Sequence, residues 1–125
     1  MSAQPFRISD TRGVPIVAAP KEIDISNAGD LRSALLTAAA QSRIVVVDLS
    51  DTEYCDSSGL NVLVGALRRA QADGGEVRLV ATQPAVLRIL NVTGIGSLFR
   101  VRASLEEALT GEADETGASQ VSVQP

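Results

Sequence analysis

Four consecutive β-branched residues, Ile44-Val45-Val46-Val47, constrain the fold of this chain more than any other feature. A strand with one face in water alternates apolar and polar residues, whereas a continuous apolar run is typical of a strand buried on both faces. The run therefore predicts a fully buried strand that ends at Asp48. Strand-like and helix-like stretches alternate on either side of it, and this order predicts an α/β domain.

Further strands are predicted over residues 6–9, 14–18, 76–81 and 100–102. The first two are expected to pair as a hairpin with Arg12-Gly13 as its turn, and the last is expected to be a short edge strand. A hairpin adds an antiparallel pair to strands that helices connect in parallel, so the sheet should be mixed. We expect a single domain with about four to five strands flanked by about four helices.

The clearest helix is predicted over residues 58–72. Its apolar residues recur at the i, i+3, i+4, i+7 spacing of one buried face, and they are Leu60, Leu63, Val64 and Leu67. A second helix is predicted over residues 28–41, with Ser26 or Asn27 as its N-cap. Its apolar stripe is assigned to Leu31, Leu35 and Leu36.

Two shorter helices are predicted near the C-terminus. Pro84 suits the first turn of a helix that runs to about Asn91. Ser104 is expected to cap a last helix that runs through Leu109, and Glu107 at the third helical position would complete a capping box.

The chain is expected to contain one domain over residues 1–110 and a flexible acidic tail over residues 111–125. Its 125 residues fit one domain. The tail contains few large apolar residues, so it cannot bury enough surface to offset the entropy of ordering it.

Composition excludes several classes of protein. The net charge of −4 and the 2% aromatic content leave neither the basic excess nor the stacking platforms that a nucleic-acid binder needs. With no histidine and only one cysteine, Cys55, a zinc site is not expected, and no cofactor is indicated. No signal-peptide core occurs within residues 1–12, and no apolar run could span a bilayer, so a cytoplasmic protein without a membrane partner is expected.

The segment Asp56-Ser57-Ser58-Gly59 lies between a polar loop and the start of the helix over residues 58–72. Ser57 or Ser58 could simply be the N-cap, or one of them could be a phosphorylatable serine. Free N–H groups and the helix dipole favour a phosphate at this position, so a modification there would change a docking surface and not the fold. Cys55 is interpreted as a small packing residue, because its acidic neighbours should raise the pKa of the thiol.

The run 44–49 followed by Asp56-Ser57-Ser58-Gly59-Leu60 resembles the STAS domain of bacterial anti-sigma factor antagonists. Upstream, Glu22-Ile23-Asp24 is similar to a family segment, and downstream the segments 90–99 and 104–109 are similar to its closing elements. The resemblance covers residues 6–109. Lys21 stands where the family usually has glycine, and Asn61 stands at a position where glycine is common.

This resemblance implies a phosphorylation switch in the partner-switching regulation of transcription under stress. The unphosphorylated protein would bind an anti-sigma factor that is itself a serine kinase, and would thereby free a sigma factor. Phosphorylation of Ser58, or alternatively Ser57, would break that complex, and a PP2C-type phosphatase would reset it. The expected partner-binding residues are Asp24, Asp56, Ser57, Ser58, Gly59 and Asn61.

The sequence lacks residues that the two catalytic alternatives require, so we do not expect an enzyme. A serine hydrolase needs a base, but the chain has no histidine and its only lysine is Lys21. A response-regulator receiver, which the position of Asp48 suggests, would need an acidic pair after the first strand and a late lysine. Asp10 stands alone there, and no lysine follows Lys21.

A STAS module that is never phosphorylated remains open as an alternative. Such a module could serve as a scaffold in a stress-sensing assembly or as a subunit of a transport complex. The stand-alone length favours the signalling protein, although a transporter subunit could have the same length.

Overall fold

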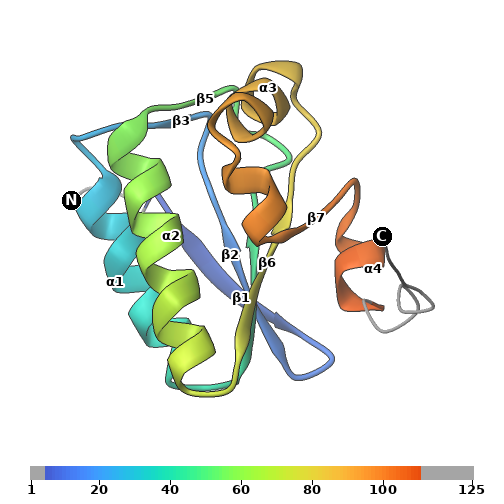
Figure 1. Ribbon diagram of the computed structural model, residues 1–125. Helices are drawn as coiled ribbons and strands as arrows, with labels where there is room; N and C mark the ends of the chain where they lie inside the picture. Colours follow the sequence, from blue (N-terminus) through green and yellow to red (C-terminus); the bar gives the residue numbers. More distant parts are fainter. Residues whose placement is uncertain (1–4, 111–125) are drawn as a thin grey trace.

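Residues 5–110 are described in the computed structural model, so the first four residues and the predicted tail over residues 111–125 lie outside the described part. The central sheet has five strands in the order β1-β2-β4-β6-β7 (Figure 1). Their bounds are β1 Arg7–Thr11, β2 Val14–Ala18, β4 Ile44–Asp48, β6 Glu76–Val80 and β7 Arg100–Arg102.

The sheet is mixed, as predicted. Strand β1 runs antiparallel to β2, whereas the pairs β2·β4, β4·β6 and β6·β7 are parallel. The apolar run forms β4 in the middle of the sheet, where Val46 and Val47 are 0% exposed. The prediction of a strand buried on both faces is therefore confirmed.

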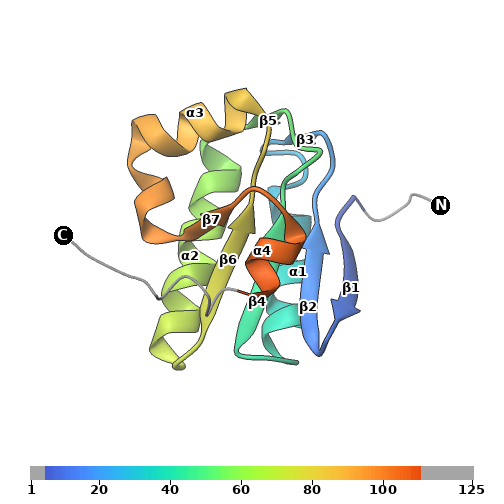
Figure 2. The same cartoon turned by 90° about the vertical axis from the view of Figure 1, so that its right-hand side faces the viewer.

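Helices cover the two faces of the sheet unequally. Two long helices, α1 (Ala28–Ala39) and α2 (Ser57–Ala72), lie side by side on one face, whereas the single turn of α4 (Leu105–Leu109) lies on the other (Figures 1 and 2). Helix α3 (Pro84–Thr93) and the 3₁₀ turn η1 (Ile95–Leu98) lie beyond the carboxyl end of β6. Four α-helices in all agree with the predicted number for residues 5–110.

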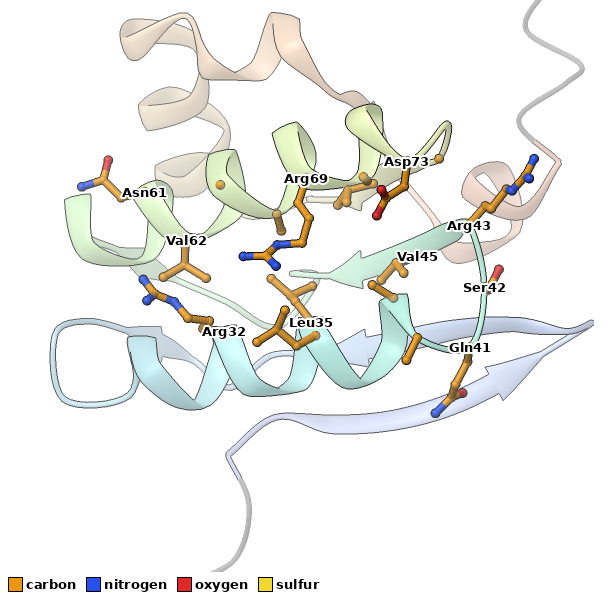
Figure 3. Close-up of a pocket in the computed structure, with 18 residues that line it drawn as sticks. Arg32, Leu35, Gln41, Ser42, Arg43, Val45, Asn61, Val62, Arg69 and Asp73 are labelled. Carbon is orange, nitrogen blue, oxygen red and sulfur yellow. The ribbon is translucent and has the colours of Figure 1, made fainter.

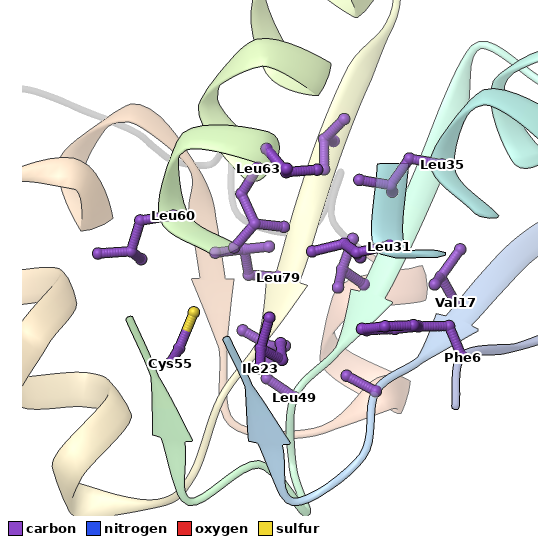
Figure 4. Packing of buried hydrophobic residues seen from close by; sticks show 14 of the residues in the cluster. Phe6, Val17, Ile23, Leu31, Leu35, Leu49, Cys55, Leu60, Leu63 and Leu79 are labelled. Atoms are coloured by element: carbon purple, nitrogen blue, oxygen red, sulfur yellow. The ribbon is translucent and has the colours of Figure 1, made fainter. Parts of the chain in front are cut away.

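The main core lies between the sheet and the pair α1–α2, and it consists mostly of aliphatic side chains (Figure 4). Its fully buried members include Val17, Ile23, Leu31, Leu49, Leu63 and Leu79. A smaller cluster under α4 contains Ile16, Val46, Val80 and Ala108. Burying apolar side chains stabilises a fold by about 1.5–3 kcal/mol for each Val or Leu, so the scarcity of aromatic residues does not prevent a stable core.

A second, two-stranded parallel ribbon lies outside the main sheet and was not predicted from the sequence. Strand β3 (Glu22–Ile23) pairs with β5 (Tyr54–Cys55), with Ile23 opposite Cys55. Two residues are too few to establish a hydrophobic period. The segment before Asp56, predicted to be a polar loop, is therefore partly a strand.

Several predicted helix details need correction. Helix α2 begins at Ser57 instead of residue 58, α1 ends at Ala39 instead of residue 41, and α3 continues to Thr93 instead of Asn91. Leu36 was assigned to the buried stripe of α1 but is 44% exposed. It lies about 100° around the helix from Leu35, outside the face that packs on the sheet.

The cap of α1 also differs from the prediction. Asn27 occupies the N-cap position, but its side chain makes no capping hydrogen bond. Its Oδ1 accepts from the N–H of Asp24 at 3.0 Å, and its Nδ2 donates to the carbonyl of Glu22 at 2.9 Å. Asn27 therefore fixes the end of β3 instead of the start of the helix.

Two local predictions are confirmed. Arg12 and Gly13 turn the β1–β2 hairpin with φ values of 56° and 81°, the left-handed pair that tight two-residue hairpin turns require. Ser104 caps α4 by accepting from the N–H of Glu107 at 3.1 Å. The Glu107 carboxylate accepts in return from the N–H of Ala103, so this capping box is shifted by one residue.

Candidate functional site

The first turn of α2 is held by the side chain of Asp56. Its Oδ1 accepts from the N–H of Ser58 at 2.8 Å and from the N–H of Gly59 at 3.3 Å. The backbone N–H of Asp56 donates to the carbonyl of Ile23 at 3.0 Å. The N-cap is therefore Asp56, and the assignment of this role to Ser57 or Ser58 was wrong, because Asp56 has the extended backbone that precedes the first helical residue.

This cap changes the expected chemistry of the helix start. A phosphate was expected to find free N–H groups there, but those of Ser58 and Gly59 already donate to a carboxylate. An added phosphate would have to displace a negative group or stay in solvent. The helix start is thus an occupied anion site, and Asp56 supplies the anion.

Both candidate serines belong to this capped turn. Ser57 is exposed and Ser58 is partly exposed. Within residues 5–110, neither hydroxyl has a hydrogen-bond partner. Asp56 binds the backbone of Ser58 and not its hydroxyl, so it fixes where Ser58 stands without acting as a base for it. The site offers a hydroxyl that can accept a group.

Asp24 lies next to Asp56 because the two residues follow paired strands. Strands β3 and β5 run parallel and end at Ile23 and Cys55, so the next residue of each strand is an aspartate. The Ser26 hydroxyl donates to Asp24 Oδ1 at 2.5 Å and the Ser26 N–H at 2.9 Å. These two bonds hold the pKa of Asp24 below its usual value, so this carboxylate is ionised at neutral pH.

Gly59 packs directly against the ribbon under the turn. A Cβ atom at this position would lie 2.6 Å from Cγ2 of Ile23 and 2.7 Å from Sγ of Cys55. Both neighbours are buried, with Ile23 at 0% exposure (Figure 4). Gly59, predicted as a partner-binding residue, therefore has a packing role that brings the serine turn close to β3 and β5.

The surface around the turn also contains exposed residues that were not singled out from the sequence. Ile25 follows Asp24 and is 78% exposed, and Tyr54 of β5 is 53% exposed. Asn61, one turn after Ser57 on α2, is exposed as well. Exposed apolar side chains also occur elsewhere on the described chain, for example Val92 and Leu98, so it is their place beside the motif that makes Ile25 and Tyr54 candidates for a contact surface. Their only signal in the sequence is their position beside Asp24 and Asp56.

Cys55 lies under the motif as a buried packing residue, as predicted. It is 6% exposed, and burial together with the charge of Asp56 raises the pKa of its thiol to about 11. The thiol stays neutral at physiological pH. The stability that the neutral thiol contributes is complete below the usual pKa of 9.0, and it decreases as the pH rises toward 11.

Cys55 is expected to react very slowly with iodoacetamide in the folded protein, because only the thiolate attacks. The rate should rise about tenfold for each pH unit from 7 to 10 and should increase sharply once the protein is unfolded. Mass spectrometry of the alkylated chain over time measures this rate. Equal alkylation rates for the folded and the urea-unfolded chain at pH 7.5 would contradict the assignment.

Replacing Asp56 with alanine removes two capping hydrogen bonds and a charge near the helix dipole. The free energy of unfolding should fall by about 1–2 kcal/mol. Urea titration followed by circular dichroism measures the change. Asp56→Asn keeps an acceptor oxygen and should lose less, so equal losses for the two variants would show that capping is not what Asp56 contributes.

Within residues 5–110, no three His, Cys, Asp or Glu side chains are grouped so that they could hold a metal ion. Over the same residues, no helix is both long and apolar enough to cross a membrane.

Comparison with known proteins identifies relatives of this arrangement. The family model described as STAS domain matches residues 6–108. An anti-sigma-B factor antagonist of Bacillus subtilis is 32% identical over 85 residues, which covers 68% of this chain and 78% of that protein. An anti-sigma-F factor antagonist of Mycobacterium tuberculosis is 30% identical over 107 residues, which covers 83% of this chain and 85% of that protein.

A crystal structure of an anti-sigma factor antagonist from Mycobacterium paratuberculosis superposes on this fold. Its TM-score is 0.78 at 30% sequence identity, and the match covers 91% of this chain and all of that one. The structural match thus covers most of the chain, and the family-model match over residues 6–108 spans the serine turn.

Proposed function

This chain belongs to the STAS domain family, and from that premise we propose that it is an anti-sigma factor antagonist controlled by phosphorylation of Ser58. Relatives that match most of the chain are named anti-sigma factor antagonists. The single observation that supports the acceptor role best is the turn capped by Asp56. It presents a serine hydroxyl without a hydrogen-bond partner among residues 5–110, on a capped helix start.

The proposed partner surface is formed by the ends of β3 and β5 and the first turns of α2. Its polar members are Asp24, Asp56, Ser57, Ser58 and Asn61, while Gly59 lies beneath them. Ile25 and Tyr54 add apolar contact area at its side. Exposed aromatic residues surrounded by polar groups often carry much of the binding energy of an interface.

The proposed mechanism assigns the chemistry to the partner. A serine-kinase anti-sigma factor binds the unmodified surface, which frees its sigma factor, and later transfers the γ-phosphoryl group of its ATP to the hydroxyl of Ser58. The kinase supplies the catalytic base and the metal ions. The new charge lies beside Asp24 and Asp56, so the complex separates, and a PP2C-type phosphatase restores the first state. This chain is a substrate and a regulator in that cycle.

Ser58 is preferred over Ser57 because the Asp56 carboxylate fixes its backbone N–H at 2.8 Å. A well-positioned hydroxyl suits in-line phosphoryl transfer, which depends mostly on positioning. Ser57 at the first helical position is the alternative acceptor.

The direct test is to incubate the full chain with candidate kinase anti-sigma factors and ATP, and then to sequence its peptides by mass spectrometry. Phosphate should appear on Ser58 in the wild type and in Ser57→Ala, and should be absent in Ser58→Ala. A complex that forms with such a kinase without any phosphate on the serine turn would favour the scaffold function. Phosphate on Ser57 alone would reassign the acceptor.

Tyr54→Ala should weaken binding of the anti-sigma factor about tenfold, because it removes an exposed aromatic side chain from the proposed surface. Isothermal titration calorimetry measures the change, and Leu98→Ala provides a control, since Leu98 is similarly exposed but lies in η1. Equal affinities of the Tyr54→Ala variant and the wild type would show that β5 is not part of the partner surface.

A further inference from the structure

A cleft of about 670 Å³ lies between α1 and α2. Its walls come from both helices, and its floor comes from β4 and β6 (Figure 3). Much of the lining is apolar and includes Leu35, Leu36, Val45, Val62, Ala66 and Val77. The volume falls in the range of about 300–1,000 Å³ that small-molecule sites occupy.

Two cations project into this cleft from opposite walls. Arg32 comes from α1 and Arg69 from α2, and both guanidinium groups end in the space between the helices (Figure 3). Neither forms an ion pair within residues 5–110. Among residues 5–110, Asp73 is the only carboxylate that lines the cleft, and the side chain of Arg43 at the far end points away from it. In a chain with a net charge of −4, the cleft is a local positive region.

The cleft stays open because α2 has no side chain at Gly65. A glycine inside a helix costs about 1 kcal/mol relative to alanine. Here no atom lies within 4 Å of the position that a Cβ would occupy, so packing does not require a glycine. The helix is therefore less stable with Gly65 than it would be with alanine, at a position that lines the cleft.

We propose that the α1–α2 cleft binds a fatty acid, with the alkyl chain on the apolar floor and the carboxylate between Arg32 and Arg69. Two guanidinium groups and one carboxylate leave one net positive charge, which matches a monoanion. Guanidinium groups bind carboxylates through paired charge-assisted hydrogen bonds. The alkyl chain would cover the apolar lining, in which Leu36 is 44% exposed. The head group would lie between the two cations, which form no ion pair within the described chain.

Titration of the full chain with sodium decanoate below its micelle concentration tests the head-group assignment. Calorimetry should show one saturable site, and Arg32→Gln and Arg69→Gln should each weaken binding about tenfold. Decyltrimethylammonium, which has the same chain length and a cationic head, should not bind. Equal affinity for the two amphiphiles, or no saturable decanoate binding, would overturn the proposal.

Gly65→Leu tests the location, because the new side chain would occupy the cleft without a clash at its Cβ. Decanoate binding should be lost while the melting temperature is retained or raised. The matched control is Gly29→Leu, since Gly29 lies in α1 with an equally open Cβ position and does not line the cleft. Unchanged decanoate affinity in Gly65→Leu would overturn the proposal. So would a wild-type chain that proves dimeric in solution and becomes monomeric in that variant, because this result would assign the cleft to a second copy of this chain.

Discussion

Ser58→Asp is expected to weaken the complex with the anti-sigma factor roughly 100-fold, since a new negative charge in a docked interface costs several kcal/mol unless a cation receives it. The neighbouring charged groups of the proposed surface are Asp24 and Asp56, and no Lys or Arg belongs to it. The substitution should not lower stability, because an acidic residue in the first turn of a helix interacts favourably with the dipole. Calorimetric titration of the partner, together with a thermal melt, measures both quantities.

Two further variants make this prediction specific to the site. Ser58→Ala should bind like the wild type and should take up no phosphate from the kinase. Thr37→Asp adds the same charge to an exposed position of α1, away from the serine turn, and should leave the affinity nearly unchanged. If Thr37→Asp weakens binding as much as Ser58→Asp, the effect is one of net charge and the switch assignment fails.

Gly59→Ala is expected to lower the free energy of unfolding by about 2–3 kcal/mol, because overpacking a filled core forces side chains or backbone to shift. The added methyl would lie 2.6 Å from Cγ2 of Ile23, which is β-branched and fully buried and therefore cannot rotate away at low cost. Urea titration followed by circular dichroism measures the loss.

Gly65→Ala provides the matched control in the same helix. No atom lies within 4 Å of its Cβ position, so this change should raise stability by up to about 1 kcal/mol through helix propensity alone. The two glycine-to-alanine changes are thus expected to have opposite signs. Stabilisation by both would show that the serine turn is not tightly packed on the ribbon.

The central fold could be predicted because its strands and helices extend over several residues with a clear apolar pattern. The run 44–47 marked the buried strand, and α2 repeats its apolar residues from Leu60 to Leu67, over about two turns. The ribbon of β3 and β5 could not be predicted, since each strand has two residues and its pairing depends on contacts between segments about thirty residues apart. Leu36 was misassigned because the buried stripe of α1 is completed by Ala34 and Ala38 on the other side of Leu35, and small alanines give a weaker apolar signal than a leucine.

The serine motif could be singled out from the sequence, but the place of each of its residues in the helix cap could not. Ser57 and Ser58 are good caps in general, so composition could not show that the carboxylate one residue earlier takes that position. The contact between Gly59 and Ile23 and the exposure of Tyr54 both follow from the ribbon, so they could not be inferred without it. The cleft was missed as well, because it depends on how α1 and α2 lie relative to each other.

The cap at Asp56 has a consequence for how quickly the proposed signal could be reversed. Because its carboxylate occupies the N–H groups of Ser58 and Gly59, a phosphate on Ser58 that does not displace this carboxylate would remain in water. A phosphatase could then reach it on the folded protein. The ratio of modified to unmodified chains would follow the relative rates of kinase and phosphatase, and the rate of unfolding would not limit it.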